Sequence, residues 1–407
     1  MSRPPAIELA DVMRAFSGQY LSTYGERMPL VHQKALEDIT ACRTPKMGGT
    51  TFLCPGCQKY HYSYHSCGNR NCNKCQNQRA QNWLDQTGQL LLPVEHFMVT
   101  FTLPEPLRAL ARSHQKLFYG LLMRCAAEAL QSLGYDPAWV GGQLAMMGVL
   151  HSWSRDLNYH PHVHMIVAGG GLWPDEELWL QARKDFLMPS KALSPVFAAK
   201  FRDGLKKNAP EVFAMSNPRV WKSPWVVHIQ NIGNAEHALK YLAQYIFRPA
   251  ISNKHIVKLA NGMVSFSYRD SKTGKWRKMR LQALEFIRRY LQHVLPRGFV
   301  KVRYYGLYAH RNRNILHRMA GKMTQNGVST GDESAPKEGS PRKARDDDDT
   351  SQPVTAPSPE CPCCGEPMVV VSVVRRGGIW PKAPPDGKKS GLINHSTSPS
   401  NYLQSVA

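Results

Sequence analysis

Residues 158–171 read NYHPHVHMIVAGGG, a stretch that predicts both a strand and a metal site. Successive side chains of a β-strand point to opposite faces, so His162 and His164 should lie side by side on one face. Two neighbouring imidazoles suit a divalent metal such as Mg²⁺ or Mn²⁺. His160 precedes Pro161 and can lie either on the same face or in the turn that leads into the strand, so its role stays open.

Further along the chain, Asn234 can cap a helix that ends before Pro249. This helix contains Tyr241 and Tyr245, and residues four apart share one helix face, so both phenol oxygens can reach one point. The tyrosines project away from the apolar stripe of the helix, which consists of Leu239, Leu242, Ala243 and Ile246. A metal that polarises a phosphodiester beside tyrosine nucleophiles describes an enzyme that cuts DNA and stays covalently attached to it.

Other polar side chains of the same helix are candidates for the rest of the site. Gln244 or His237 could supply a third metal ligand, and Arg248 could hold a phosphate. Two tyrosines permit two successive transesterifications without water, which favours strand transfer over simple nicking.

The charge of the chain predicts a polyanionic partner. The 407 residues include 52 Lys and Arg against 30 Asp and Glu, for a net charge of +22. No apolar run approaches the ~18 residues of a membrane span, and the N-terminus lacks the plan of a secretory signal. We therefore expect a cytoplasmic protein, associated with the bacterial nucleoid, that binds DNA and no membrane. Its oligomeric state stays open.

Ten cysteines in a reducing compartment indicate metal binding rather than disulfides. Two C-x-x-C knuckles, Cys54 with Cys57 and Cys72 with Cys75, can present four thiolates to one tetrahedral Zn²⁺. Cys125 lies in an apolar stretch and is expected to be a core thiol.

The remainder of the cysteine-rich block leaves further sites open. A second zinc could use its other ligands, which are Cys42, Cys67, His61 and His65. Basic residues interleaved with tyrosines suit contact with phosphates and bases, and the candidates are Arg70, Lys74 and Arg79. The CPCC sequence at 361–364 resembles half of a zinc ribbon with no partner cysteines after it, so metal binding there is left open.

The order of the expected elements predicts an α+β protein. Residues 1–92 combine two helices with the cysteine block, and 93–320 alternate strands and helices, with a hairpin around Gly274. Residues 321–360 have the composition of a disordered linker, and 361–407 hold the CPCC motif and a polar tail.

These motifs together resemble the HUH-type, two-tyrosine transposases of the rolling-circle insertion sequences, the family called insertion sequence ninety-one. The resemblance covers most of the chain and rests on four segments, CRT…CPGC…YHSCGNRNCNKCQ, NYHPHVHMIVAGGG, YLAQYIFRPAIS and FIRRYLQHVLPRGFVKVRYYGLYA, together with the terminal CPCCGEPM. It implies an HUH endonuclease domain, with a central antiparallel sheet and helices, preceded by a small zinc-binding domain.

The resemblance also implies roles and partners. His162 and His164 would be the metal-binding pair, and Tyr241 and Tyr245 the nucleophiles. The substrates would be single-stranded insertion-sequence ends and target DNA, cut and rejoined through a 5′-phosphotyrosine intermediate.

Other functions use some of the same residues. A rolling-circle replication initiator or a conjugative relaxase would share the histidine and tyrosine chemistry. A non-catalytic zinc-finger regulator would account for the charge and the cysteines but not for the paired tyrosines. A metal-dependent hydrolase would use the histidines with water.

Overall fold

The computed structural model describes residues 7–75, 83, 88, 90–173, 178–238, 249–270, 273–325 and 358–381. These residues divide into two units. Unit 1 comprises those up to residue 40 and those from 69 to 325, and unit 2 comprises 41–68 and 358–381. The predicted domain order placed residues 1–92 together and the C-terminal motif apart. The structure divides the chain differently because a strand near the C-terminus pairs with one from the cysteine block.

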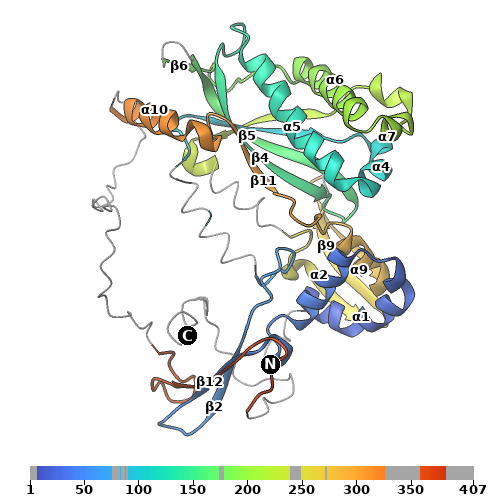
Figure 1. Cartoon of the computed structure of the whole chain (residues 1–407), viewed down its shortest axis with the longest axis vertical. Coiled ribbons are helices and arrows are strands. Elements are labelled where there is room, and N and C mark those ends of the chain that lie inside the picture. Colours follow the sequence, from blue (N-terminus) through green and yellow to red (C-terminus); the bar gives the residue numbers. More distant parts are fainter. Residues whose placement is uncertain are drawn as a thin grey trace. The chain divides into compact units, whose positions relative to one another are not determined.

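In the described part of the chain, six strands form the main sheet of unit 1 (Figure 1). Among the described residues its order is β11-β4-β5-β3-β7, with β6 pairing the far end of β5, and every pair in it is antiparallel. The strands are β3 (His96–Thr102), β4 (Gln143–Trp153), β5 (Tyr159–Trp173), β6 (Leu178–Gln181), β7 (Val227–Gly233) and β11 (Val302–Gly306). The central position of β5 explains its apolar sequence, because both of its faces are covered.

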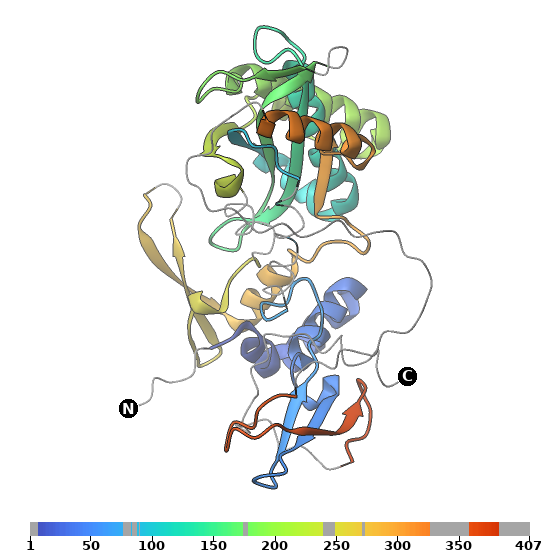
Figure 2. The same cartoon turned by 90° about the vertical axis from the view of Figure 1, so that its left-hand side faces the viewer.

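Helices cover both faces of this sheet. On one face, Val163 and Met165 of β5 pack in a core with α5 and α6. On the other, Ile166 and Ala168 pack with Leu316 of α10, and Figure 2 shows α10 lying across the strands. The helices of this layer are α4 (Arg108–Ser113), α5 (Gln115–Gly134), α6 (Ser190–Asn208), α7 (Pro210–Ala214) and α10 (Arg313–Gln325). Cys125 is 1% exposed within the first core, as predicted for a core thiol.

A second, smaller layer of unit 1 combines a three-stranded sheet with helices. Its order is β10-β9-β8, and Phe286 of α9 packs against Phe266 of β9 with ring centroids 5.8 Å apart. The predicted hairpin is confirmed, since Trp276 pairs with Arg269 and Gly274 takes a positive φ of 68° in the turn. The elements are α1 (Leu9–Tyr24), α2 (Leu30–Ala41), β8 (Ile256–Ala260), β9 (Met263–Arg269), β10 (Trp276–Gln282) and α9 (Ala283–Leu291).

Unit 2 contains a three-stranded antiparallel sheet in the order β12-β1-β2. Its strands are β1 (Gly49–Leu53), β2 (Tyr60–Tyr64) and β12 (Val369–Val374). Phe52 and Met368 are buried with Cys54 and Cys361 in a small core of its own.

Short 3₁₀ turns connect several of these elements, at Gly25–Arg27, Pro45–Met47, Glu105–Leu107, Pro218–Trp221, Asn253–His255 and His310–Asn312. The described elements make an α+β protein with antiparallel sheets, so the predicted fold class is confirmed. Within the described part of the chain, no helix has the length and apolar composition that a bilayer crossing requires.

Candidate active site and cysteine centre

Three histidines meet on one face of the main sheet. His151 on β4 pairs directly with His162 on β5, and His164 lies two residues further along β5. One ring nitrogen from each of the three lies within 4.8 Å of the others. Ring centroids are 4.8 Å apart for His162 and His164, and 4.9 Å for His151 and His164. The sequence therefore predicted two members of this group and missed His151.

Two of the three imidazoles have hydrogen-bond partners at Nδ1. The Nδ1–H of His162 donates to the backbone carbonyl of His160 at 2.7 Å, which places its lone pair on Nε2. Nδ1 of His164 lies 3.0 Å from the hydroxyl of Thr100 on the neighbouring strand β3. Partners of this kind fix the tautomer and orientation of metal-ligating histidines. The donor set fits a divalent ion.

The electrostatic surroundings keep the predicted pair neutral. Burial is the main cause that lowers the pKa of His162 to about 4; the hydrogen bond to the carbonyl of His160 opposes it, and the charges of His160 and Arg108 add to it. Burial also lowers the pKa of His164 well below its usual value, with His162 and Lys301 adding to the effect. A neutral imidazole is the form that binds a metal, so both residues are ready ligands at neutral pH.

A cavity of about 560 Å³ opens beside the histidines. Its lining includes three arginines and two carboxylates, which are Arg108, Arg155, Arg269, Asp156 and Asp270. The Nε of Arg108 is buried and makes no hydrogen bond within the described part of the chain. His160, whose role the sequence left open, also lines the cavity and does not belong to the three-histidine group.

The predicted nucleophiles Tyr241 and Tyr245 lie outside the described residues, as do Gln244, Arg248 and Arg79. The predicted cap of their helix is present, because the side chain of Asn234 accepts a hydrogen bond from the backbone N–H of His237 at 3.0 Å. The last three residues of the segment YLAQYIFRPAIS, Ala250 to Ser252, line the histidine cavity. His237 is exposed and is not brought to the three histidines.

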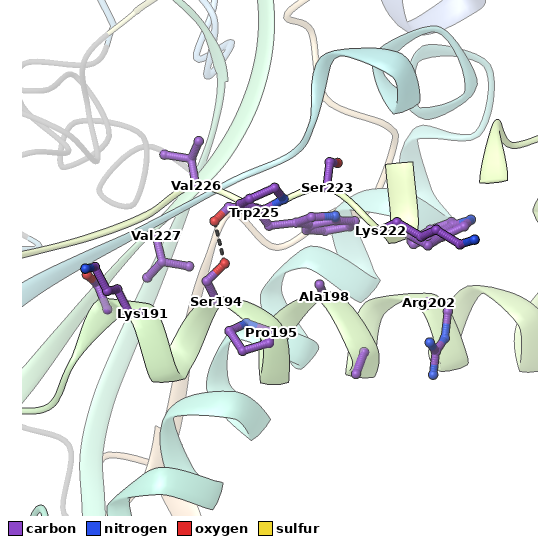
Figure 3. A pocket seen from close by; sticks show the side chains of 14 residues that line it. Lys191, Ser194, Pro195, Ala198, Arg202, Lys222, Ser223, Trp225, Val226 and Val227 are labelled. Atoms are coloured by element: carbon purple, nitrogen blue, oxygen red, sulfur yellow. Dashed lines mark hydrogen bonds between the residues drawn. The ribbon is translucent and has the colours of Figure 1, made fainter. Parts of the chain in front are cut away.

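A second cavity, of about 530 Å³, lies between α6 and the segment before β7 (Figure 3). Its lining carries the cations Lys191, Arg202 and Lys222 and no acidic residue. Trp221 and Trp225 stack at 5.7 Å between centroids, and the hydroxyl of Ser194 donates to the carbonyl of Trp225 at 2.6 Å. The segment continues towards the histidine site, since the backbone N–H of Thr102 donates to the carbonyl of Val226 at 3.1 Å.

The cysteines of unit 2 form a group that crosses the length of the sequence. Cys54 and Cys57 lie with Cys361 and Cys364, and the four Sγ atoms are within 4.8 Å of one another. The grouping of Cys54 and Cys57 with Cys72 and Cys75 is therefore not the one observed. The remaining cysteines of the N-terminal block are Cys42, Cys67, Cys72 and Cys75.

Two of the basic residues that the sequence offered for DNA binding, Arg70 and Lys74, contact other residues of the protein. The guanidinium of Arg70 donates to the carbonyls of Phe299, Leu295 and Pro296 at 2.7 to 3.2 Å. Lys74 pairs with Glu8 at 2.6 Å. Burial lowers the pKa of His65, which is in none of the possible metal groups of the described residues. We therefore expect Arg70 and Lys74 to stabilise the fold rather than contact DNA.

Sequence comparisons with known proteins match both parts of the chain. A family model described as "Putative transposase" matches residues 145–315, which include all three histidines. A model described as "Transposase zinc-binding domain" matches residues 12–103.

Two curated relatives match most of the chain. "Putative transposase y4qJ" of Sinorhizobium fredii is 34% identical over 324 residues, 75% of this chain and 81% of that protein. "Transposase for insertion sequence element IS801" of Pseudomonas savastanoi pv. phaseolicola is 26% identical over 302 residues, 69% of this chain and 71% of that protein. On these matches, the chain belongs to the IS91 family of transposases, with a zinc-binding domain towards its N-terminus.

Proposed function

We propose that this transposase nicks and rejoins single-stranded DNA at insertion-sequence ends, through a 5′-phosphotyrosine intermediate formed by Tyr241 and Tyr245. The observation that carries the proposal is the group of His151, His162 and His164 beside a cavity lined with arginines. Three imidazoles on neighbouring strands form a site for Mg²⁺ or Mn²⁺. When bound, the ion would polarise the scissile phosphate and neutralise part of its charge.

The position of the described residues around the tyrosine motif supports this assignment. β7 runs antiparallel to β3, so the helix that begins after Gly233 starts at the end of the sheet away from His162. Ala250 to Ser252, the last three residues of the segment YLAQYIFRPAIS, line the histidine cavity. Both tyrosines lie in sequence between these two described points, at positions 241 and 245.

The covalent step exchanges one phosphate ester for another. The hydroxyl oxygen of a tyrosine attacks the phosphorus, and the bond from phosphorus to the 3′ oxygen breaks. The tyrosine proton ends on the released 3′-hydroxyl. Because no water is consumed, the energy of the bond is retained for rejoining to another strand. A second tyrosine would allow two such linkages in sequence.

Other residues of unit 1 would bind the DNA strand. Arg108 is placed to contact the phosphate, since its buried Nε makes no hydrogen bond among the described residues and it faces the histidine cavity. The cavity of Figure 3 places the half-buried Trp221 beside Lys191 and Lys222, a combination that suits a base and phosphates of a single strand. Thr102 and Val226 connect the two cavities through one hydrogen bond.

Zinc has a structural part in this proposal. The matched zinc-binding domain, residues 12–103, contains the N-terminal cysteine block and is the part of the chain expected to bind structural Zn²⁺.

Incubation with end-labelled DNA tests the function. With Mg²⁺, single-stranded element ends should give a band that survives denaturing electrophoresis and is removed by protease, and the same sequence as a duplex should give none. Addition of a second end should yield joined DNA, which separates a transposase from an enzyme that only nicks. Metal-dependent cleavage with no covalent band would contradict the tyrosine mechanism and favour hydrolysis.

A further inference from the structure

The CPCC motif near the C-terminus has the same backbone structure as the CPGC motif near the N-terminus. In the first, the N–H of Gln58 donates to the carbonyl of Cys54 at 2.9 Å, and in the second the N–H of Gly365 donates to the carbonyl of Cys361 at 2.8 Å. Gln58 and Gly365 both have positive φ, 55° and 82°. The residue after each motif therefore makes the same turn.

A second hydrogen bond repeats in both motifs. The N–H of Cys54 donates to the carbonyl of Lys59 at 3.0 Å, and the N–H of Cys361 donates to the carbonyl of Glu366 at 2.8 Å. Such tight turns direct both thiols of a C-x-x-C motif to one point, as in zinc knuckles. Two equivalent knuckles in one small unit are the two halves of a zinc ribbon.

The distances between the thiols fit a metal and not disulfides. Sγ of Cys54 lies 3.3 Å from Sγ of Cys364, and Sγ of Cys57 lies 3.6 Å from Sγ of Cys361. Four thiolates about 2.3 Å from one zinc would be separated by about 3.8 Å, whereas a disulfide requires about 2.05 Å. Backbone N–H groups point at the sulfurs, from Cys57 to Cys54 at 3.5 Å and from Cys363 to Cys361 at 3.4 Å. Donors of this kind stabilise thiolates.

The strands of unit 2 bring the two knuckles together. Leu53, immediately before the first knuckle, pairs with Val369, which follows the second. Phe52 and Met368 fill the space behind the cysteines and are 5% and 1% exposed. A core this small supplies little stability by itself, so a bound metal would contribute much of the folding free energy of the unit.

We propose that Cys54, Cys57, Cys361 and Cys364 bind one structural Zn²⁺, and that the ribbon of this transposase is complete only with residues 358–374. The matched zinc-binding domain ends at residue 103, so half of this site lies outside it. The site joins segments more than three hundred residues apart, since Cys54 and Cys364 are separated by 310 positions. The proposal does not depend on the tyrosine mechanism, because it concerns binding of zinc to the folded chain.

Mapping of protected thiols on the full chain tests the ligand set. The zinc-loaded protein is alkylated, and each cysteine is then quantified by peptide mass spectrometry with and without a strong chelator. Cys54, Cys57, Cys361 and Cys364 should be protected together and become reactive together, while Cys363 is reactive throughout. Reactive Cys361 and Cys364 beside protected Cys54 and Cys57 would overturn the proposal.

Matched variants test the stoichiometry. Cys364→Ser should lower the zinc content by one per chain, and Cys363→Ser, the adjacent thiol, should leave it unchanged. Cys364→His replaces the thiolate by a nitrogen ligand and should keep the zinc even if the serine variant unfolds the ribbon. His61 lies 3.4 Å from Cys361 and forms another possible group with Cys361 and Cys363. Loss of zinc in Cys363→Ser but not in Cys364→Ser would assign the metal to that group and contradict the proposal.

Discussion

The histidine site and the cysteine ribbon are both candidate metal centres, but the chain builds them in different ways. The histidines lie on two adjacent strands of a large sheet whose cores on both faces are independent of any metal. The ribbon cysteines come from opposite parts of the sequence and have a core of four buried residues. The first site is therefore presented by a fold that is already stable. The cysteine site, in contrast, would stabilise the fold of unit 2 itself.

This difference determines what a metal does in each place. At the histidines the ion would act on the substrate, and its loss should affect the rate of reaction. At the cysteines it would hold β1 and β12 together, and its loss should affect structure.

Removal of zinc is expected to have the largest effect. Structural zinc contributes about 10–16 kcal/mol in small zinc-binding folds, so a strong chelator should unfold the ribbon. Hydrogen exchange followed by mass spectrometry should show loss of protection in residues 49–64 and 369–374 and unchanged protection in β4 and β5. Continued protection of β1 and β12 in metal-free protein would remove the distinction between the two centres.

Loss of a histidine ligand is expected to have the second-largest effect. His151→Ala, like His162→Ala and His164→Ala, should lower the rate of DNA cleavage by more than about 100-fold, because a direct ligand matters more than its supporting partner. Affinity for DNA should remain, since it comes mainly from contacts to phosphates. His228→Ala is the control, because His228 is exposed on β7 and paired with Thr100 but outside the group. Full cleavage by His151→Ala would reassign this residue to packing against Trp153.

The partner of His164 should have a smaller effect. Thr100→Val keeps the shape of the side chain and removes the hydroxyl 3.0 Å from Nδ1, so the metal concentration needed for half-maximal cleavage should rise about 10- to 100-fold. Saturating metal should restore the rate. Thr102→Val, on the same strand, should leave the metal dependence unchanged, and an equal shift in both variants would mean that the hydroxyl has no specific role.

The basic cavity should give the smallest change. Lys191→Ala and Lys222→Ala should each weaken binding of single-stranded DNA, and each should reduce the salt dependence of log K by about 0.7. Lys206→Ala, an exposed lysine of α6 outside the cavity, is the matched control. Equal losses in all three would indicate a diffuse charge effect rather than a path for the strand.

The sequence predicted what depends on local pattern. The alternation in β5 correctly placed His162 and His164 opposite Val163 and Met165, and the cap at Asn234 and the turn at Gly274 are also present. No local pattern distinguishes His151, and its role became visible only when the register paired it with His162. Knowledge of which strands are neighbours would have been enough to find it.

Contacts between distant segments could not be predicted in this way. The spacing of Cys54, Cys57, Cys72 and Cys75 predicted that all four bind one zinc. A second C-x-x-C knuckle nearby in the sequence is the obvious partner for the first, and the local pattern does not point to a more distant one. The C-terminal motif was recognised as half of a ribbon, but its other half lies before the whole region that the transposase model matches. Arg70 had the sequence context of a DNA contact, yet three backbone carbonyls occupy its guanidinium.

The most direct test of the central claim is to identify the residue that carries DNA after cleavage. The protein is reacted with a single-stranded element end and Mg²⁺, digested, and the DNA-linked peptide is sequenced by mass spectrometry. The account predicts a linkage at Tyr241 or Tyr245, no linkage in the double variant Tyr241→Phe/Tyr245→Phe, and greatly reduced linkage in His151→Ala. Linkage at a tyrosine outside this pair, or undiminished linkage in the double variant, would contradict it.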